Sequence, residues 1–310
     1  MAKYLITRLL QTILVLFIVV TVVFVILRGV GDPSKLLVSP EGTFEDLQQL
    51  RKILGLDEPL HVQYFNYLRD ILRGDFGNSF YYSRPVMDLI MEHLPATLLL
   101  GGVSLLIAVP LALLAGIVSA VKRNSVLDNS VTTLTIAGRS VPTFWFGLIL
   151  ILLFSVNLKM LPASGYGAPK QLILPVITMS ASMLASTARL TRSAMLDVMR
   201  QDYMTTARAK GVREGRVIVK HGLRNALLSV VTMIAMQIGY MFSGSVVIES
   251  VFAWPGVGRL MVSAIVQYDY PLVQACTLFM AILFALINFI TDWLYTIIDP
   301  RIRMGAAAAS

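Results

Sequence analysis

Residues 98–121 read Leu98-Leu-Leu-Gly-Gly-Val-Ser-Leu-Leu-Ile-Ala-Val-Pro-Leu-Ala-Leu-Leu-Ala-Gly-Ile-Val-Ser-Ala-Val121, a run without one charged side chain, and Lys122 and Arg123 follow it directly. A helix needs about 20 mostly apolar residues to cross the hydrocarbon core of a bilayer. Lys and Arg beside such a run are enriched on the cytoplasmic side of the membrane. The stretch therefore predicts a transmembrane helix that ends in the cytoplasm.

The composition of the whole chain also indicates a membrane protein. Of its 310 residues 56% are hydrophobic and only 14% are charged, whereas soluble domains carry about 25% charged residues. We expect an all-α membrane protein, because six windows are long and apolar enough to span a bilayer. The windows are Leu9–Leu27, Leu98–Val121, Val131–Val156, Leu172–Leu196, Leu227–Val251 and Leu272–Ile298.

The charged residues orient these six windows. The net charge is +8, and the basic residues lie between apolar runs, which is typical of juxtamembrane charge and argues against nucleic-acid binding. Residues 189–224 hold nine Lys or Arg and three acids, whereas residues 32–92 hold six bases and ten acids. Six spans put every basic segment on one side, so we expect both termini in the cytoplasm.

The windows divide the chain into segments. The first apolar run is longer than the roughly 7–15 apolar residues of a signal peptide, so it is interpreted as a retained span. We expect residues 1–30 to form an N-terminal transmembrane helix and residues 31–95 a periplasmic cap. Residues 96–300 form a core of five spans with a cytoplasmic loop at 197–225, and residues 301–310 are a C-terminal tail.

Two short helices are predicted in the outer segment. The first is Thr43–Leu54, with Thr43 as its N-cap, Asp46 at the capping-box position and Gly55 as the residue that closes it. The second is Val62–Leu72, where apolar residues recur at helical spacing. They predict a small helical cap that is too short to bind a ligand alone.

The sequence offers no catalytic constellation. None of the three histidines (His61, His93, His221) lies in a window, so Ser243 in the fifth window has no histidine to act as its base. No metalloprotease motif and no phosphate-binding loop is present, and Cys276 is the single cysteine. We expect no catalytic residue, no metal site and no cofactor on this chain. If ATP drives the protein, another chain binds it.

Charged and polar residues inside the windows are candidates for a translocation path. Arg139 lies in the third window and Asp292 in the sixth, at comparable depths. We hypothesise that they pair or line the path; alternatively, Arg139 reaches the interface with its long side chain and Asp292 packs locally. Gln237 and Asn288 are weaker candidates, because such residues often join helices.

The inner loop 197–225 is the most informative segment. Its first part suits a short amphipathic helix capped by Gly211, and Glu214–His221 suits a second one. The residues that suggest an apolar face are Val198, Tyr203, Ala207 and Ala209. Such a loop either docks into a groove on a partner or lies on anionic lipid, and its spacing leaves both interpretations open.

The two halves of this loop resemble a known motif. The stretch Tyr203-Met-Thr-Thr-Ala-Arg-Ala-Lys-Gly211, followed by His221-Gly-Leu-Arg-Asn225, is similar to the loop by which permeases of ABC importers contact their ATPases. Thr205 and Thr206 replace Glu-Ala of the motif and Arg224 replaces Pro, as in the first-permease subunits of the dipeptide, oligopeptide and nickel group. The resemblance assigns ATPase coupling to Tyr203, Met204, Thr205, Thr206, Ala207, Arg208, Ala209, Lys210, Gly211, His221, Arg224 and Asn225.

Further stretches along the chain resemble the same group. Arg139 departs from the pattern, since relatives carry a small or uncharged residue before Val141-Pro142. The matching stretches are Gly31-Asp-Pro33, Leu54-Gly-Leu-Asp-Glu-Pro59, Gly74-Asp-Phe-Gly-Asn-Ser79, Leu94-Pro-Ala-Thr97, Leu190-Thr-Arg-Ser-Ala-Met-Leu196, Val251-Phe-Ala-Trp-Pro-Gly-Val-Gly-Arg259, Asp269-Tyr-Pro-Leu-Val-Gln274 and Asp299-Pro-Arg-Ile-Arg303.

The resemblance implies a type I ABC importer permease in a bacterial inner membrane. The chain would form half of a path for di- or oligopeptides, with nickel or metal chelates or glutathione as the alternative cargo. Expected partners are a homologous second permease, two cytoplasmic ATPases that bind ATP and Mg, the lipid bilayer and an extracytoplasmic solute-binding protein. Residues assigned to the outer gate or that protein are Glu249, Trp254, Pro255 and Gly256. A stand-alone channel or secondary transporter is the rival interpretation.

Overall fold

The computed structural model describes residues 2–32, 34, 43–53 and 55–298, and these are almost entirely helical. Four helices are long and apolar enough to span a membrane, and two bent pairs bring the number to six if each pair is one span. The elements are α1 (Ala2–Val30), α3 (Phe44–Ile53), α4 (Leu60–Leu72), α5 (Val86–Val121), α6 (Val126–Ser140), α7 (Thr143–Leu150), the π-helical segment η1 (Ile151–Asn157), α8 (Pro169–Met199), α9 (Asp202–Ala209), α10 (Glu214–Arg216), the π-helical segment η2 (Val217–Leu223), α11 (Arg224–Val251), α12 (Val257–Val266) and α13 (Tyr270–Ile298).

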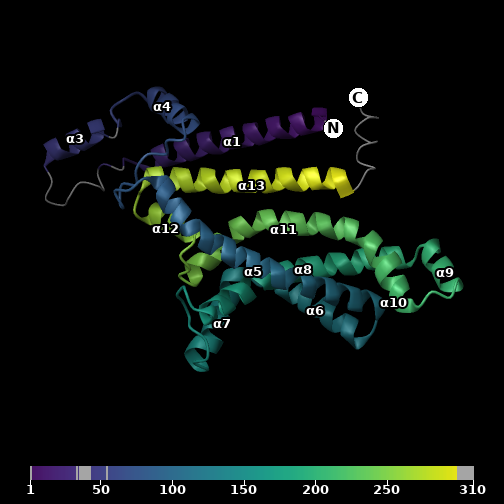
Figure 1. The fold of residues 1–310 in the computed structure, drawn as a ribbon. Coiled ribbons are helices and arrows are strands. Elements are labelled where there is room, and N and C mark those ends of the chain that lie inside the picture. Colours follow the sequence, from purple (N-terminus) through teal and green to yellow (C-terminus); the bar gives the residue numbers. More distant parts are fainter. Residues whose placement is uncertain (1, 33, 35–42, 54, 299–310) are drawn as a thin grey trace.

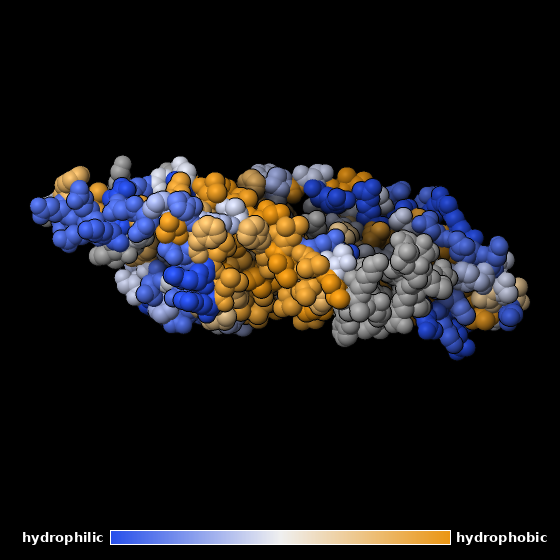
Figure 2. Space-filling view, turned by 90° about the horizontal axis from the view of Figure 1, so that it is seen from above, coloured by the Kyte–Doolittle hydropathy of each residue, from blue (hydrophilic) through white to orange (hydrophobic). Residues whose placement is uncertain are grey.

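The long helices run between two polar ends of the molecule. α1 and α13 lie side by side, and the start of α1 and the end of α13 point to the same end as α9 and α10 (Figure 1). An apolar band crosses the middle of the molecule between hydrophilic ends (Figure 2). This arrangement is what an even number of spans in a bilayer requires.

The packed centre of the fold is the pair α5 and α8, joined by α11. Small residues allow the close approach: a Cβ on Gly116 of α5 would lie only 2.6 Å from Cβ of Thr191 and 2.7 Å from the Ala188 carbonyl oxygen on α8. Glycine and hydroxyl residues at helix interfaces are typical of membrane proteins, in which packing rather than the hydrophobic effect holds helices together. The Ser- and Thr-rich fourth window is therefore an interhelical surface.

The third predicted span, Val131–Val156, is not one straight helix. α6 and the α7–η1 segment meet at an angle of 104°. The cause is Pro142, which has no N–H to donate and disfavours helical backbone at the residue before it. Val141 accordingly has extended dihedral angles, φ −88° and ψ 124°. The fifth span also bends, by 51° between Leu227 and Ser229, where it leaves the inner loop.

α5 begins at Val86, before the predicted start at Leu98, because its first turns carry polar residues that a hydropathy window rejects. Its 36 residues correspond to about 54 Å at about 1.5 Å per residue. A bilayer core is only about 30 Å thick. The outer turns of α5 therefore extend beyond the bilayer toward the cap.

Both predicted cap helices are present. In α3 the Thr43 hydroxyl oxygen accepts from the Asp46 backbone N–H (3.3 Å), and the Asp46 carboxylate accepts from the Thr43 N–H (2.8 Å), which confirms the capping box. These hydrogen bonds lower the pKa of Asp46. Gly55 closes the helix with φ +63°. Leu54, the predicted last residue, lies outside the described residues.

Candidate functional site

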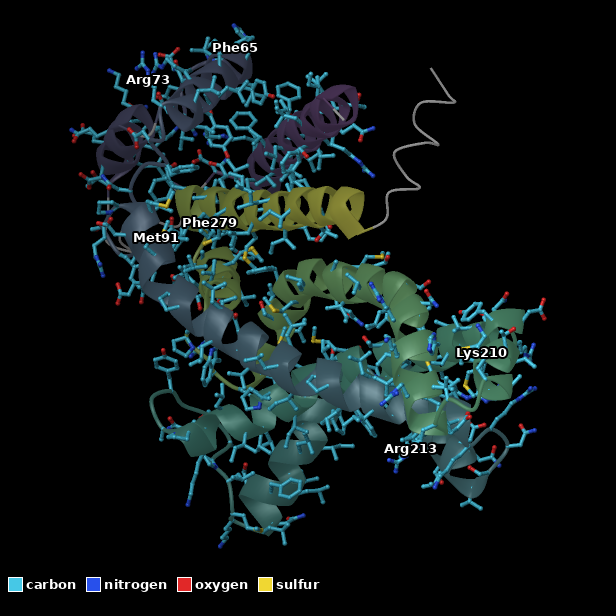
Figure 3. The ribbon with its side chains drawn as sticks, turned by 45° about the vertical axis from the view of Figure 1, so that its right-hand side comes forward. Phe65, Arg73, Met91, Lys210, Arg213 and Phe279 are labelled. Carbon is cyan, nitrogen blue, oxygen red and sulfur yellow. The ribbon has the colours of Figure 1, made fainter. Side chains whose placement is uncertain are left out.

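α9 lies at the end of the molecule that carries Lys210 and Arg213, opposite the cap where Phe65 and Arg73 lie (Figure 3). Its buried face consists of Met204 and Ala207, which pack on Val217 of η2. The predicted apolar face was partly wrong, because Tyr203 and Ala209 are exposed and Val198 belongs to α8. The helix is too short for the spacing of its apolar residues to predict which side is buried. Packing against η2 determines the buried side instead.

Gly211 ends α9 as predicted. Its φ is +76°, a left-handed conformation that side chains with a Cβ adopt only at a cost. The turn is closed by two backbone hydrogen bonds, from Gly211 N–H to the Arg208 carbonyl (2.9 Å) and from Val212 N–H to the Ala207 carbonyl (3.3 Å). This closure turns the chain back so that α10 and η2 cover α9.

Polar contacts fix the two halves of the inner-loop motif to each other. The Arg208 guanidinium donates to both carboxylate oxygens of Glu214, at 3.0 Å and 3.1 Å for the two shortest contacts. The Asn225 amide donates to the His221 carbonyl (2.9 Å) and to the Tyr203 hydroxyl (3.2 Å). The spacing between the halves is therefore the length of chain needed to fold η2 back onto α9.

The outer face of α9 is exposed in the single chain. Its exposed residues, together with those of the following turn, form what we call the α9 surface, made up of Tyr203, Thr205, Thr206, Arg208, Ala209 and Lys210. Arg213, Arg216, Lys220 and Arg224 are exposed beside it and extend the basic character. A short rigid helix with one buried apolar face and one exposed polar face is suited to fill a groove on another protein.

Residues that sequence reasoning missed join α5, α6 and α8 to one another. Asp128 at the start of α6 is 1% exposed and accepts from the Arg192 guanidinium of α8 at 2.6 Å (Nε to Oδ1) and 2.9 Å (Nη2 to Oδ2). It also accepts from the Ser119 hydroxyl of α5 and from the Asn124 N–H. The sequence feature that could have pointed to Asp128 is Ser125, an N-cap residue three positions before it. It was missed because both residues precede the apolar window in which charged residues were sought.

At the opposite end, the outer-gate candidates form a buried cluster. Glu249 is 0% exposed and accepts from the Thr97 hydroxyl (2.8 Å) and from the Arg259 backbone N–H (3.0 Å). The Trp254 indole N–H donates to the Ala96 carbonyl (2.8 Å). A Cβ at Gly256 would collide with the Glu249 carboxylate.

The expected role of these residues at the outer gate or in contact with a binding protein stays a prediction. Glu249, Trp254 and Gly256 are covered and Pro255 is half-buried, and in this conformation Glu249 and Trp254 hold the loop against α5. Nearby, the Arg259 side chain is exposed, and its guanidinium donates to the Ala253 carbonyl (2.5 Å).

Among the described side chains, no hydrogen bond or ion pair joins the path candidates to one another. Arg139 is exposed near the end of α6, whose main packing partners are α5 and α8, whereas α13 packs on α1, α11 and α12. The side chain of Asp292 lies outside the described residues, so the proposed pairing stays a prediction. Gln237 is buried on α11, and Asn288 lines a pocket between α13 and α1.

Comparison with known families gives two matches. Residues 112–304 match the family described as "Binding-protein-dependent transport system inner membrane component", and residues 1–101 match the N-terminal region "Binding-prot-dependent transport system membrane comp, N-term". Together the two matches account for nearly all of the chain, including the α9 surface and the buried Glu249 cluster.

Curated relatives are similar over the whole length. The chain is 44% identical over 304 residues to "Glutathione transport system permease protein GsiC" of Escherichia coli (strain K12), with 98% of this chain and 99% of the relative covered. The protein of the same name from Salmonella typhi is also 44% identical over 304 residues, with the same coverage of each chain.

Solved structures share the fold at low sequence identity. An inward-facing structure of the MetNI methionine ABC transporter is similar with a TM-score of 0.59 and 20% identity, covering 69% of this chain and 97% of that chain. A structure of an amino acid ABC transporter with histidines has a TM-score of 0.51 and 16% identity, covering 68% and 94%. At these identities the likeness concerns the fold alone.

Proposed function

We propose that this chain forms half of an import path for short peptides. It belongs to the family of binding-protein-dependent transport system inner membrane components and is thus a multi-pass ABC importer permease. Glutathione is the first cargo to test, since a glutathione permease is 44% identical over 98% of the chain. Other di- and oligopeptides come next, and metal chelates are the alternative cargo.

The importer would contain four further kinds of partner. A homologous second permease completes the path, and two cytoplasmic ATPases bind ATP and Mg, for which this chain has no motif. A solute-binding protein delivers cargo at the outer side, and lipid surrounds the spans. In this arrangement both termini, the inner loop and the α9 surface face the cytoplasm, as the distribution of Lys and Arg favours.

The α9 surface carries this proposal, because its residues are exposed while contacts of Tyr203 with Asn225 and of Arg208 with Glu214 fix its position. We propose that it is the coupling element, with Met204 as the buried anchor. When the ATPases close on ATP, α9 moves with them, and η2 and the Asp128–Arg192 pair pass the displacement to α8 and α6. The transition is a rigid-body movement of packed helices, so no residue of this chain needs to be catalytic.

The requirement for ATPases is the test that separates this proposal from a stand-alone channel or secondary transporter. The chain is reconstituted in proteoliposomes with and without the second permease, the ATPases and the binding protein, and uptake of labelled glutathione and dipeptides is measured. We expect uptake only when all subunits and ATP are present. Uptake by this chain alone would reject the importer assignment, and ATP-driven uptake of chelates alone would reject the peptide cargo.

A further inference from the structure

An outer cavity of about 750 Å³ lies between the cap and the outer ends of α1 and α13. This volume is within the range of about 300–1,000 Å³ of small-molecule sites in proteins. Its walls come from α4, from the loop 75–83, from Arg28 near the end of α1 and from Tyr270 at the start of α13. The cavity therefore lies at one end of these two spans, between them and the cap.

One wall of the cavity is a face of α4, and contacts between α4 and α1 fix its position. Gln63, Asn66, Tyr67 and Asp70 line the cavity and follow one another at helical spacing. Behind them, Tyr64 contacts α1 through a hydrogen bond to the Thr21 hydroxyl (2.6 Å). The rings of Tyr64 and Tyr67 pack against Phe24 at centroid distances of 5.2 Å and 5.7 Å, so this face of α4 is positioned before any ligand binds.

The other walls are fixed by long-range hydrogen bonds. Asp269, which is 0% exposed, accepts from the Ser79 hydroxyl and from the backbone N–H groups of Phe80 (3.1 Å) and Tyr81 (3.2 Å). The Gln63 amide donates to the carbonyls of Leu56 (3.2 Å) and Glu58 (2.7 Å). The loop and the turn that frame the cavity are thus attached to α13 and α4, and the cavity is preformed.

The lining of the cavity carries charged side chains of both signs. Arg28 is the one basic residue of the lining, and Glu58, Asp70 and Asp75 are acidic. The Arg28 guanidinium lies 5.5 Å from the centroid of Phe24 and makes no ion pair with a side chain that the structure describes. The Asp32 carboxylate also acts electrostatically on Arg28, while its hydrogen bonds go to Arg51 and Ser34. The lining therefore holds one cation without an ion pair among the described side chains and three carboxylates, of which Asp70 also accepts from the Arg69 guanidinium (3.1 Å).

We propose that this outer cavity binds one small zwitterion, with its oxyanion at Arg28 and its ammonium group at the carboxylates led by Asp70. Two molecules carry this chemistry: the headgroup of phosphatidylethanolamine and the two charged ends of a short peptide. The acidic excess disfavours ligands with net negative charge, because like charges in a partly desolvated site repel each other. The site depends only on the fold and is independent of the proposed cargo.

The test is a binding measurement on the purified full chain in detergent. Short-chain phosphatidylethanolamine and alanyl-alanine are titrated by calorimetry, with short-chain phosphatidylglycerol and N-acetyl-alanine amide as charge controls. We expect saturable binding of one zwitterion and none of either control. Binding of the lipid alone identifies a headgroup site, binding of the dipeptide alone or of both identifies a site open to free solute, and binding of neither zwitterion overturns the proposal.

Variants locate the binding. Arg28→Gln and Asp70→Asn should each weaken binding by about tenfold or more, since each removes a charge-assisted hydrogen bond. Arg28→Lys retains the charge and should keep part of the affinity. Arg73→Gln is the matched control, because Arg73 follows α4 but does not line the cavity. Unfolding midpoints without ligand report on folding, and wild-type affinity in a folded Arg28→Gln variant would overturn the site.

Discussion

At the scale of single residues, two buried carboxyl groups explain how two ends of the molecule are held. Asp128 and Glu249 each lie fully covered and accept several hydrogen bonds. A buried carboxylate is tolerated only when its lone pairs are satisfied, so each of them joins the helices that supply its donors. Asp128 joins α5, α6 and α8 on the inner side, and Glu249 joins α5, α11 and α12 on the outer side.

The replacement Asp128→Asn should destabilise the protein by about 3 kcal/mol, because it leaves the Arg192 guanidinium without its anion. Arg192→Lys should lower the free energy of unfolding by less, since it keeps the charge and loses only the bidentate geometry. Thermal unfolding in detergent measures both effects. Asp197→Asn, an exposed acid on the same helix as Arg192, serves as control. Equal midpoints for Asp128→Asn and Asp197→Asn would refute the role of the pair.

At the scale of elements, features that depend on neighbouring residues could be predicted from the sequence, whereas contacts between distant residues could not. The capping box of Thr43 and Asp46 and the closing turn at Gly211 could be predicted, because each depends on residues within one helical turn. The hydrogen bond between Thr97 and Glu249 joins residues 152 positions apart, and no pattern in one sequence reports it. The bend at Pro142 was missed because an average of hydropathy does not register a missing N–H donor.

The turn at Gly211 allows a test of how the orientation of α9 matters. Gly211→Val should strain the turn by about 1–2 kcal/mol, because its left-handed backbone disfavours any Cβ. The expected result is continued ATP hydrolysis with reduced uptake in the reconstituted importer. Gly215→Val is the matched control, with open space around it and no left-handed backbone. If both variants transport alike, the geometry of the turn is unimportant for coupling.

The capping box of α3 predicts a pH dependence confined to the cap. The lowered pKa of Asp46 means that its carboxylate stabilises the helix above the unfolded value near 3.8, and that this stabilisation is lost as the pH falls through the lower folded value. The protection factors of the α3 amides, which are exchange rates corrected for the intrinsic pH dependence, should therefore fall at acidic pH in the wild type. In Asp46→Ala they should be low throughout, whereas Glu45→Gln should follow the wild type. Protection factors that do not change with pH in the wild type would contradict this.

At the scale of the whole molecule, the fold separates an outer part from an inner part that meet at α5, α8 and α11. The cap helices α3 and α4 and helix α12 lie at one end, and α9 lies at the other (Figure 1). The six windows and the family could be predicted from the sequence, because hydropathy and short motifs are local. The packing that relates the two ends became visible only in the structure.

The most direct test of coupling through α9 is the number of ATP molecules hydrolysed per solute imported in the reconstituted importer. One alanine inserted between Thr206 and Ala207 turns the rest of α9 by about 100° and removes Ala207 from its seat on η2. A matched insertion in the outer loop, between Ser164 and Gly165, leaves α9 intact. The account predicts that the α9 insertion raises this ratio at least tenfold while the outer insertion leaves it unchanged. A wild-type ratio in the α9 insertion variant would contradict it.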